Sequence, residues 1–161
     1  MQKKTKGFSL IELLIVVAII LVVAAMAVPS LLRSRISANE ASAVASLRSI
    51  NTAEVAYSVA YPQMGYSDDL SKLKPPPVGV APDSNSAGLL DSVLACAAQP
   101  RPKSGYQFAV ATVVGFPVDG YTLTAVPITL GQTGVRGFCS DQLARMTYDP
   151  NGASACSSSL Q

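Results

Sequence analysis

The residue with the clearest chemical demand is Glu12, a carboxylate at the start of a long apolar run. Residues 13–32, which follow it, contain no charged side chain. A charged side chain near the centre of a bilayer costs on the order of 2.5 to 3.5 kcal/mol on insertion scales. A carboxylate in this place needs a partner, and we expect Glu12 to have a specific one.

Residue types that support catalysis are scarce in this chain. It has no histidine and no G-x-S-x-G, P-loop or C-x-x-C motif, so the common nucleophile-plus-base and phosphate-binding arrangements are missing. Asp141, Asp149 and Asn151 are candidate calcium ligands. Their spacing does not match an EF-hand loop, and solvated turn residues are the simpler interpretation. We therefore expect no enzymatic activity, no metal and no cofactor.

The apolar run is long enough to cross a membrane. About 20 helical residues, rising about 1.5 Å each, span a hydrocarbon core of about 30 Å. Lys3, Lys4 and Lys6 precede the run, and such positive charge stays cytoplasmic. We expect a single-pass helix over residues 8–32, with the rest of the chain in the periplasm or outside the cell.

The N-terminus also has features of a secretory signal peptide. A signal peptide would combine the same lysines and apolar run with the cleavage pattern Ala25-Met26-Ala27. Against it stand Glu12 and a helical pattern that continues through Pro29. A plain signal anchor, in which Glu12 lies near the lipid headgroups, is a second alternative.

The segment Lys6-Gly7-Phe8-Ser9-Leu10-Ile11-Glu12 resembles the processing site of type IV pilins of the IVa-like kind. It is also similar to that of the related type II secretion pseudopilins. The resemblance covers residues 1 to about 61, and beyond them only the outline is similar. It implies that a membrane prepilin peptidase cuts between Gly7 and Phe8 and removes residues 1–7 as a leader. The same enzyme would then methylate the new amine of Phe8.

The resemblance also implies a partner for Glu12. The freed amine of Phe8, with a reference pKa near 7.7 to 8, lies one helical turn from this carboxylate. In the family the glutamate meets the amine of a neighbouring subunit, so two charges too costly to bury singly are buried together and set the register. The implied partners are further copies in a helical filament, ATP-driven assembly machinery in the inner membrane, and lipid before assembly.

Residues 33–61 continue the helix as an amphipathic segment, which predicts packing on a sheet, with a coiled coil as the alternative. Pro29 removes a backbone hydrogen bond, and we expect a kink there. The apolar stripe consists of Ile36, Ala43, Ile50 and Tyr57, with Leu47 and Tyr61 on the adjoining line. The polar positions between these apolar residues are Arg33, Arg35, Glu40, Arg48 and Asn51.

The C-terminal part reads as a long loop followed by strands. Residues 62–104 are rich in proline, glycine and aspartate, with a short helix predicted at 89–95. The predicted fold class is α+β, the pilin fold, with a long N-terminal helix packed on a three- or four-stranded antiparallel sheet at 105–148; residues 33–161 form the head. The predicted strands are residues 106–114, 120–126, 135–139 and 145–148.

Three cysteines leave the disulfide pairing open. In an oxidising compartment, Cys139 and Cys156 would close a loop of roughly 18 residues, worth on the order of 3 kcal/mol by chain entropy. This pairing resembles the disulfide-bounded terminal loop of many pilins, and it leaves Cys96 unpaired. The alternatives are Cys96 with Cys139, or three buried thiols.

The charge of the chain bears on its partners. The formal charge of +2 becomes −1 without the three leader lysines, with nine basic against ten acidic side chains. This is not the balance of a nucleic-acid-binding protein.

We expect a structural subunit of a type IV pilus, held in the bacterial inner membrane before assembly and in an extracellular filament afterwards. It would support adhesion, twitching motility or DNA uptake. The alternatives are the major pseudopilin of a type II secretion system and a membrane-anchored binding module without a filament.

Overall fold

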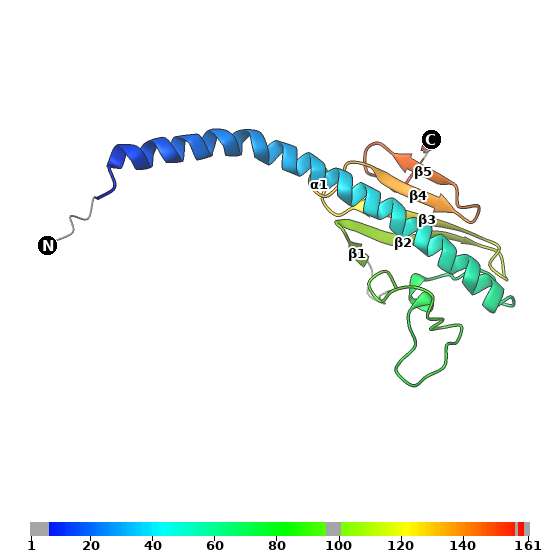
Figure 1. Cartoon of the computed structure of the whole chain (residues 1–161). Coiled ribbons are helices and arrows are strands. Elements are labelled where there is room, and N and C mark those ends of the chain that lie inside the picture. Colours follow the sequence, from blue (N-terminus) through cyan, green and yellow to red (C-terminus); the bar gives the residue numbers. More distant parts are fainter. Residues whose placement is uncertain (1–6, 96–100, 157, 160–161) are drawn as a thin grey trace. The chain divides into compact units, whose positions relative to one another are not determined.

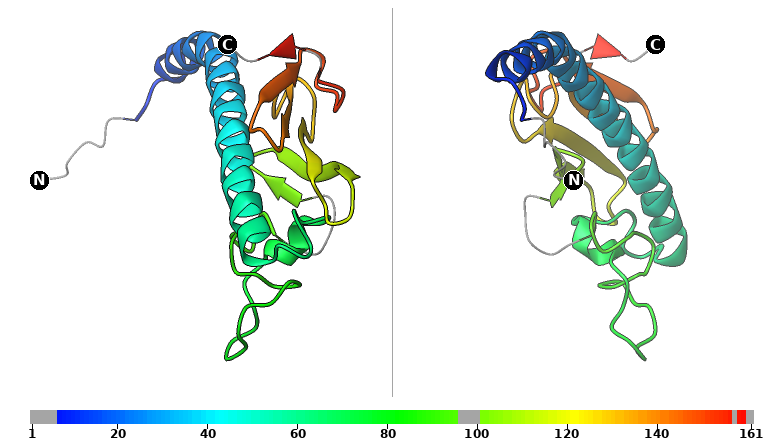
Figure 2. Two further views of the ribbon diagram at one scale, coloured as in Figure 1. Left: turned by 90° about the vertical axis from the view of Figure 1, so that its right-hand side faces the viewer. Right: turned by 60° about the vertical axis from the view of Figure 1, so that its left-hand side comes forward.

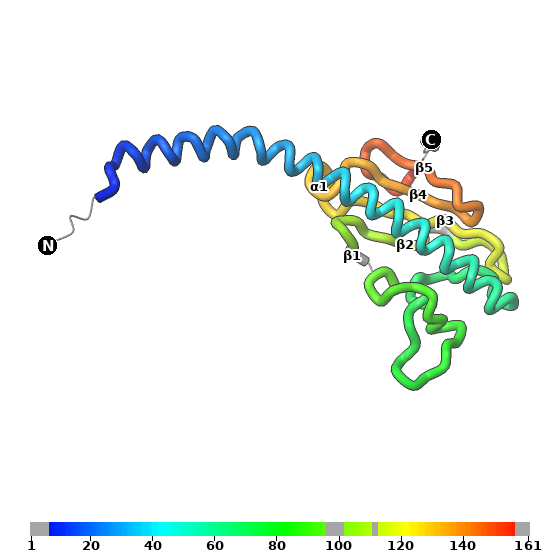
Figure 3. The backbone as a smooth tube through the Cα atoms, in the orientation of Figure 1, coloured from blue at the N-terminus to red at the C-terminus, as the bar shows by residue number. Residues whose placement is uncertain are grey.

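The computed structural model describes residues 7–95, 101–156 and 158–159. Figures 1 and 3 show one long helix followed by a sheet. The chain divides into two compact units, Met1–Arg35 and Ile36–Gln161. The elements are α1 (Leu10–Ala60), the short 3-10 helix η1 (Leu70–Leu73), β1 (Arg101–Lys103), β2 (Tyr106–Val114), β3 (Gly120–Pro127), β4 (Gly137–Asp141), β5 (Met146–Asp149) and β6 (Ser158–Ser159).

The strands form one antiparallel sheet in which the order along the chain is also the order in space. The predicted hairpin is confirmed as β2 and β3, and Pro127 ends the second strand. Among the described residues the sheet has six strands, where three or four were predicted. The two additional strands, β1 and β6, lie at the sheet edges and have three and two residues. Segments this short carry no readable alternation, and Pro102 disfavours a strand at β1.

Apolar side chains of α1 pack with the sheet to form the core of the second unit, as the helix crosses one face of the sheet in Figure 2. Ala43, Leu47, Ile50 and Tyr57 from the predicted stripe have no exposed surface. The periodicity of the sequence therefore identified the buried face of the helix correctly. From the sheet, the same core contains Tyr106, Phe108, Tyr121, Leu123, Ala125 and Phe138.

The segment after α1 contributes to this core through η1. The 3-10 helix begins after Asp69, whose side chain accepts a hydrogen bond from the backbone N–H of Ser71. Leu70 and Leu73 have no exposed surface. Part of the predicted loop region is therefore packed against the head rather than solvated.

The helix predicted at 89–95 is wrong, because this segment forms a single turn. The N–H of Ala95 donates to the carbonyl of Asp91 at 2.9 Å, and the Asp91 carboxylate accepts two further backbone N–H groups within the turn. Leu90 and Leu94 are buried in the core. These two leucines are four residues apart, and from the sequence alone this spacing in a turn cannot be distinguished from the spacing in a helix.

Cys139 and Cys156 form a disulfide, with their Cα atoms 5.9 Å apart. This is the preferred pairing of the sequence analysis. It ties the segment after β5 to β4, which lies between β3 and β5 in the sheet. Cys96, the alternative partner, lies outside the described residues.

Glu40 joins α1 to the chain just before β4. Its Oε1 accepts the backbone N–H groups of Val135 and Arg136, each at 3.1 Å, and its Oε2 accepts the Arg136 guanidinium at 2.6 and 2.9 Å. Burial alone would raise the pKa of Glu40, but these hydrogen bonds hold it below the usual value. The sequence placed Glu40 among the polar positions of the helix, and the structure buries it to 7% exposure.

Asn51, also assigned to the polar positions, is buried and connects the helix to two strands. Its Oδ1 accepts the hydroxyl of Tyr121 on β3 at 2.9 Å, and its Nδ2 donates to Ser140 Oγ on β4 at 2.6 Å. A buried amide needs such partners because an unsatisfied one would cost about 1 to 3 kcal/mol. Asn51 therefore contributes to the register of α1 on the sheet.

Glu54 is a buried carboxyl that the sequence analysis did not single out. It has no exposed surface, and it accepts hydrogen bonds from the N–H of Ser67 at 2.8 Å and from Ser67 Oγ at 2.5 Å. Burial raises the pKa of Glu54 to about 7, and the nearby charge of Asp68 acts in the same direction. The contact fastens the chain after α1 back onto the helix.

The titration of Glu54 predicts a pH dependence of stability. Its pKa is 4.5 in the reference state and about 7 in the folded chain. Between these values the folded chain keeps a proton that the unfolded chain loses, so the free energy of unfolding falls as pH rises. Glu54→Gln should remove this decrease in the free energy of unfolding, which amounts to about 2 to 3 kcal/mol between pH 5 and pH 8. Urea unfolding of the full chain in detergent at pH 5 to 8 measures it, with Asp68→Asn as the control that keeps most of the slope. A Glu54→Gln slope equal to that of the wild type would contradict this assignment.

The hydrogen bonds of Glu40 predict a second effect on stability. Glu40→Ala leaves two backbone N–H groups without their acceptor and breaks the pair with Arg136, so we expect a loss of about 2 to 3 kcal/mol. Arg145→Ala is the matched control, because Arg145 and Asp141 form an exposed pair at 3.8 Å. Exposed pairs contribute about 0 to 1 kcal/mol. Equal losses in the two variants would show that Glu40 does not hold the head in this way.

Candidate functional site

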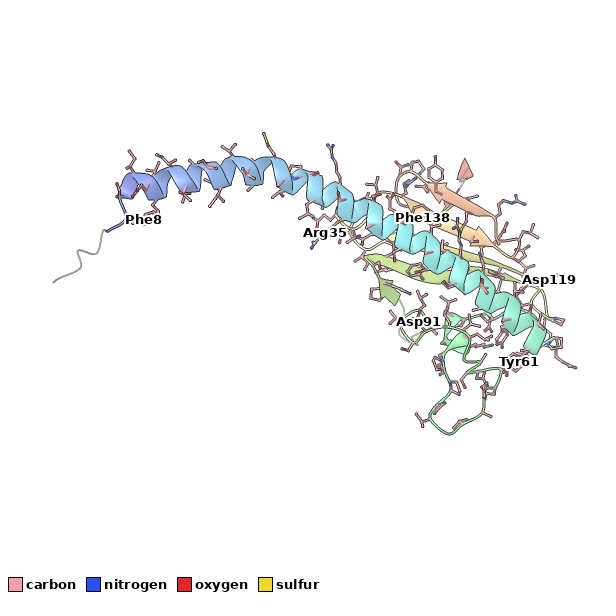
Figure 4. All side chains as sticks on the ribbon, in the orientation of Figure 1. Phe8, Arg35, Tyr61, Asp91, Asp119 and Phe138 are labelled. Atoms are coloured by element: carbon pink, nitrogen blue, oxygen red, sulfur yellow. A yellow bond between two sulfur atoms is a disulfide. The ribbon has the colours of Figure 1, made fainter. Side chains whose placement is uncertain are left out.

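The segment from Gly7 to Ser9 precedes the helix and is exposed. Among the described residues, none beyond the chain neighbours of Gly7 comes within 4 Å of the position that a Cβ there would occupy, and the Phe8 side chain is 82% exposed. Figure 4 shows Phe8 just ahead of the first helical turn. The Gly7–Phe8 peptide bond therefore lies in a non-helical, accessible stretch, which is the form of backbone that a peptidase can bind.

The first turn of α1 is closed by Glu12. Its Oε2 accepts the backbone N–H of Ser9 at 2.9 Å, and the first helical hydrogen bond runs from Leu13 N to the carbonyl of Ser9 at 3.3 Å. Ser9 is thus the N-cap and Glu12 the third helical residue, half of a capping box. A carboxylate here also interacts favourably with the positive end of the helix dipole. Within one chain, the charge of Glu12 therefore has a local partner, the N–H of Ser9, at the start of the apolar segment.

This capping arrangement was missed by the sequence analysis, although its signal was readable. The pattern Ser-x-x-Glu directly before an apolar run is a sequence signature of a helix N-terminus. An interpretation of Glu12 through its charge alone does not reveal it. The structure adds that the same side chain shapes the backbone next to the Gly7–Phe8 bond.

The apolar segment behind Glu12 is uncovered in its own unit. Its large side chains are exposed, among them Leu14 at 61%, Leu21 at 64% and Met26 at 74%. Within the part of the chain that the structure describes, α1 is the one helix long and apolar enough to cross a membrane, judged by length and composition. About 20 exposed apolar side chains are unstable in water, so this segment requires lipid or other helices around it.

Pro29 lies inside α1, and the helix is continuous through it. The ring nitrogen of Pro29 has no hydrogen to donate, so the carbonyl of Ala25 does not accept the helical hydrogen bond from residue 29. Ser34 Oγ donates to the carbonyl of Ser30 at 3.1 Å one turn later. The kink expected at Pro29 stays a prediction.

The candidate calcium ligands are occupied in local turns. The Asp141 carboxylate accepts the N–H groups of Leu143 and Arg145, and the Asp149 carboxylate accepts those of Asn151 and Ala153. Among the described residues, no group of three acidic, cysteine or histidine side chains is placed to hold a metal ion. These aspartates cap local turns.

Comparison with known proteins bears on the N-terminal segment. Residues 2–28 match the family model of the prokaryotic N-terminal methylation motif. No solved structure gives a significant match to the chain. The match contains Gly7, Phe8, Glu12 and most of the apolar segment, and α1 is followed by an antiparallel sheet as in the pilin fold. The chain therefore carries the type IV prepilin-like N-terminal methylation signal, the feature that type IV pilins and pseudopilins share.

Proposed function

We propose that this chain is a structural subunit of a type IV pilus that polymerises through α1. The observation that carries the proposal is Glu12, a single carboxylate at the start of an otherwise uncharged apolar segment within the matched methylation motif. An ordinary anchor gains nothing from such a charge. A subunit that must take one axial position among its neighbours does gain from the charge, because only one position pairs it. The role is structural, and we propose no catalytic activity.

Processing is the first step of the proposed pathway. Prepilin peptidase cuts between Gly7 and Phe8, and the three leader lysines leave with the leader. The exposed, non-helical backbone around Gly7 supports this position. Hydrolysis of the peptide bond by water creates an amine on Phe8, to which the peptidase transfers a methyl group from an activated methyl donor. A methylated amine remains a cation near neutral pH, so the new terminus keeps the charge that Glu12 requires.

Assembly is the second step. In the membrane, lipid surrounds the exposed apolar side chains of α1, and in the filament the helices of other copies replace it. The Glu12 carboxylate exchanges its hydrogen bond with Ser9 for the Phe8 amine of a neighbouring subunit. Two charges that are costly to bury singly then enter the apolar interior as a pair. Only one axial offset between neighbours satisfies both groups, so the pair sets the register.

A type II secretion pseudopilin is the alternative, because the same motif supports that class. The disulfide-bounded segment between Cys139 and Cys156 favours the pilus, since it resembles the terminal loop of many pilins. Deletion of the gene separates the two functions. Loss of surface fibres supports the pilus, whereas loss of exoprotein secretion alone supports the pseudopilus.

The role of Glu12 predicts the behaviour of Glu12→Gln. A glutamine oxygen still accepts the N–H of Ser9, so the helix start is kept, while the charge is removed. We expect normal membrane insertion and cleavage but at least a tenfold loss of assembled filament, a factor that corresponds to about 1.4 kcal/mol. Sheared surface protein, compared with total envelope protein, measures the ratio.

Ser9→Ala is the matched control for this experiment. It alters the N-cap residue but leaves both the Glu12 carboxylate and the Phe8 amine in place, so filaments should form. If Glu12→Gln assembles normally, the charge of Glu12 is dispensable and the register proposal fails, whatever the result for Ser9→Ala. Normal fibres from both variants would favour an anchored protein without a charge-selected filament.

A further inference from the structure

Three aliphatic side chains are exposed on the connection between β3 and β4, residues 128–136. Ile128, Leu130 and Val135 are 44%, 59% and 44% exposed. No charged residue occurs from Gly120 through Val135. The one charge in the connection, Arg136, is paired with Glu40. Exposed aliphatic side chains that gather in one stretch make it a candidate contact surface for an apolar partner.

Most backbone N–H groups of this connection donate to acceptors inside the protein, so the connection can enter a weakly polar environment at low cost. Gly131 N donates to the carbonyl of Gly134 at 2.8 Å, and Thr129 N donates to Thr133 Oγ1 at 3.0 Å. A backbone N–H without a partner is costly in a weakly polar environment, and a satisfied one is not. The N–H groups with acceptors inside the protein are those of Ile128, Thr129, Gly131, Gln132, Thr133, Val135 and Arg136.

Contacts with α1 fix the connection at the N-terminal end of the head. Asn39 Nδ2 donates to the carbonyl of Thr133 at 2.8 Å, and the Glu40 carboxylate accepts the N–H of Val135 at 3.1 Å. Figure 1 shows this gold connection beside the part of α1 where the head begins. The opposite end of the head carries the chain after α1, where Val118 pairs with Gly65.

The distance to the membrane follows from the helix. Arg33 and Arg35 are the first charges after the apolar segment, and such residues lie at the headgroup level. Asn39 comes four residues after Arg35, a rise of about 6 Å in a helix. The headgroup layer of one leaflet is about 5 to 7 Å thick. The attachment point of the connection is therefore within or just outside this layer, whatever the orientation of the head.

We propose that the connection at residues 128–136 docks on the lipid surface while the chain is a membrane-anchored monomer. Ile128, Leu130 and Val135 enter the boundary between headgroups and acyl chains, and the head is held against the bilayer until the subunit is withdrawn. Lipid is the occupant because Asn39, which holds the connection, follows Arg35 at the headgroup level by four helical residues. The inference rests on the membrane anchoring of α1 and not on the kind of filament.

The test uses the fact that the chain has no tryptophan, so an introduced one is the sole indole reporter. Leu130→Trp is placed in the full chain, reconstituted at one copy per lipid nanodisc with acyl chains brominated near the headgroup. We expect a blue-shifted emission and loss of more than half of the fluorescence to bromine quenching. Val78→Trp is the matched control, because Val78 is a fully exposed aliphatic residue outside this connection. It should keep most of its fluorescence.

Two further reporters give every outcome a meaning. Ile128→Trp repeats the test if Leu130→Trp fails to fold, and it should be quenched in the same way. Equal quenching at positions 130 and 78, or none at 130 and 128, overturns the proposal. Quenching that appears only with several copies per disc assigns the surface to a second copy and also overturns it. Leu31→Trp, at the headgroup end of the apolar segment, reports the anchor itself, and an unquenched Leu31→Trp means that the anchoring has failed, independently of pilus function.

Discussion

The cost of placing the Glu12 carboxylate among apolar side chains is the constraint on which the N-terminal unit depends. Twenty uncharged residues behind Glu12 have to be covered by lipid or by other helices, and the carboxylate cannot follow them inward without a partner. In the isolated chain the N–H of Ser9 meets this need at the helix start. Processing would supply a cation one turn away, and assembly would exchange one partner for the other.

The head depends on a related device, in which buried polar side chains of the same helix fix its position on the sheet. Glu40, Asn51 and Glu54 each bond to a different element, at the beginning, middle and end of the covered part of α1. Apolar packing supplies most of the stability, but it tolerates sliding along the stripe. Directional hydrogen bonds do not, so the helix carries the head in one register.

The sequence predicted the features that repeat over many residues and missed those decided by single contacts. The long helix, its buried stripe and the β2–β3 hairpin were visible because periodicity accumulates over their length. The burial of Glu40 and Asn51 was not, because it depends on acceptors and donors about 90 residues away along the chain. The turn at 91–95 and the two short edge strands were missed for another reason, because segments this short show no readable periodicity. At the N-terminus, the heptapeptide predicted roles for Gly7, Phe8 and Glu12, whereas the capping role of Glu12 was missed although the Ser-x-x-Glu pattern signals it.

The most direct test of the central claim is the amino terminus and intact mass of the protein, recovered both from the cell envelope and from sheared surface material. The account predicts a chain that begins at Phe8 and carries one additional methyl group in both fractions. A chain that begins at Val28 would indicate an ordinary secreted protein. A chain that retains Met1 would indicate a signal anchor. Either result would contradict the assignment of Glu12 as the partner of a processed amine.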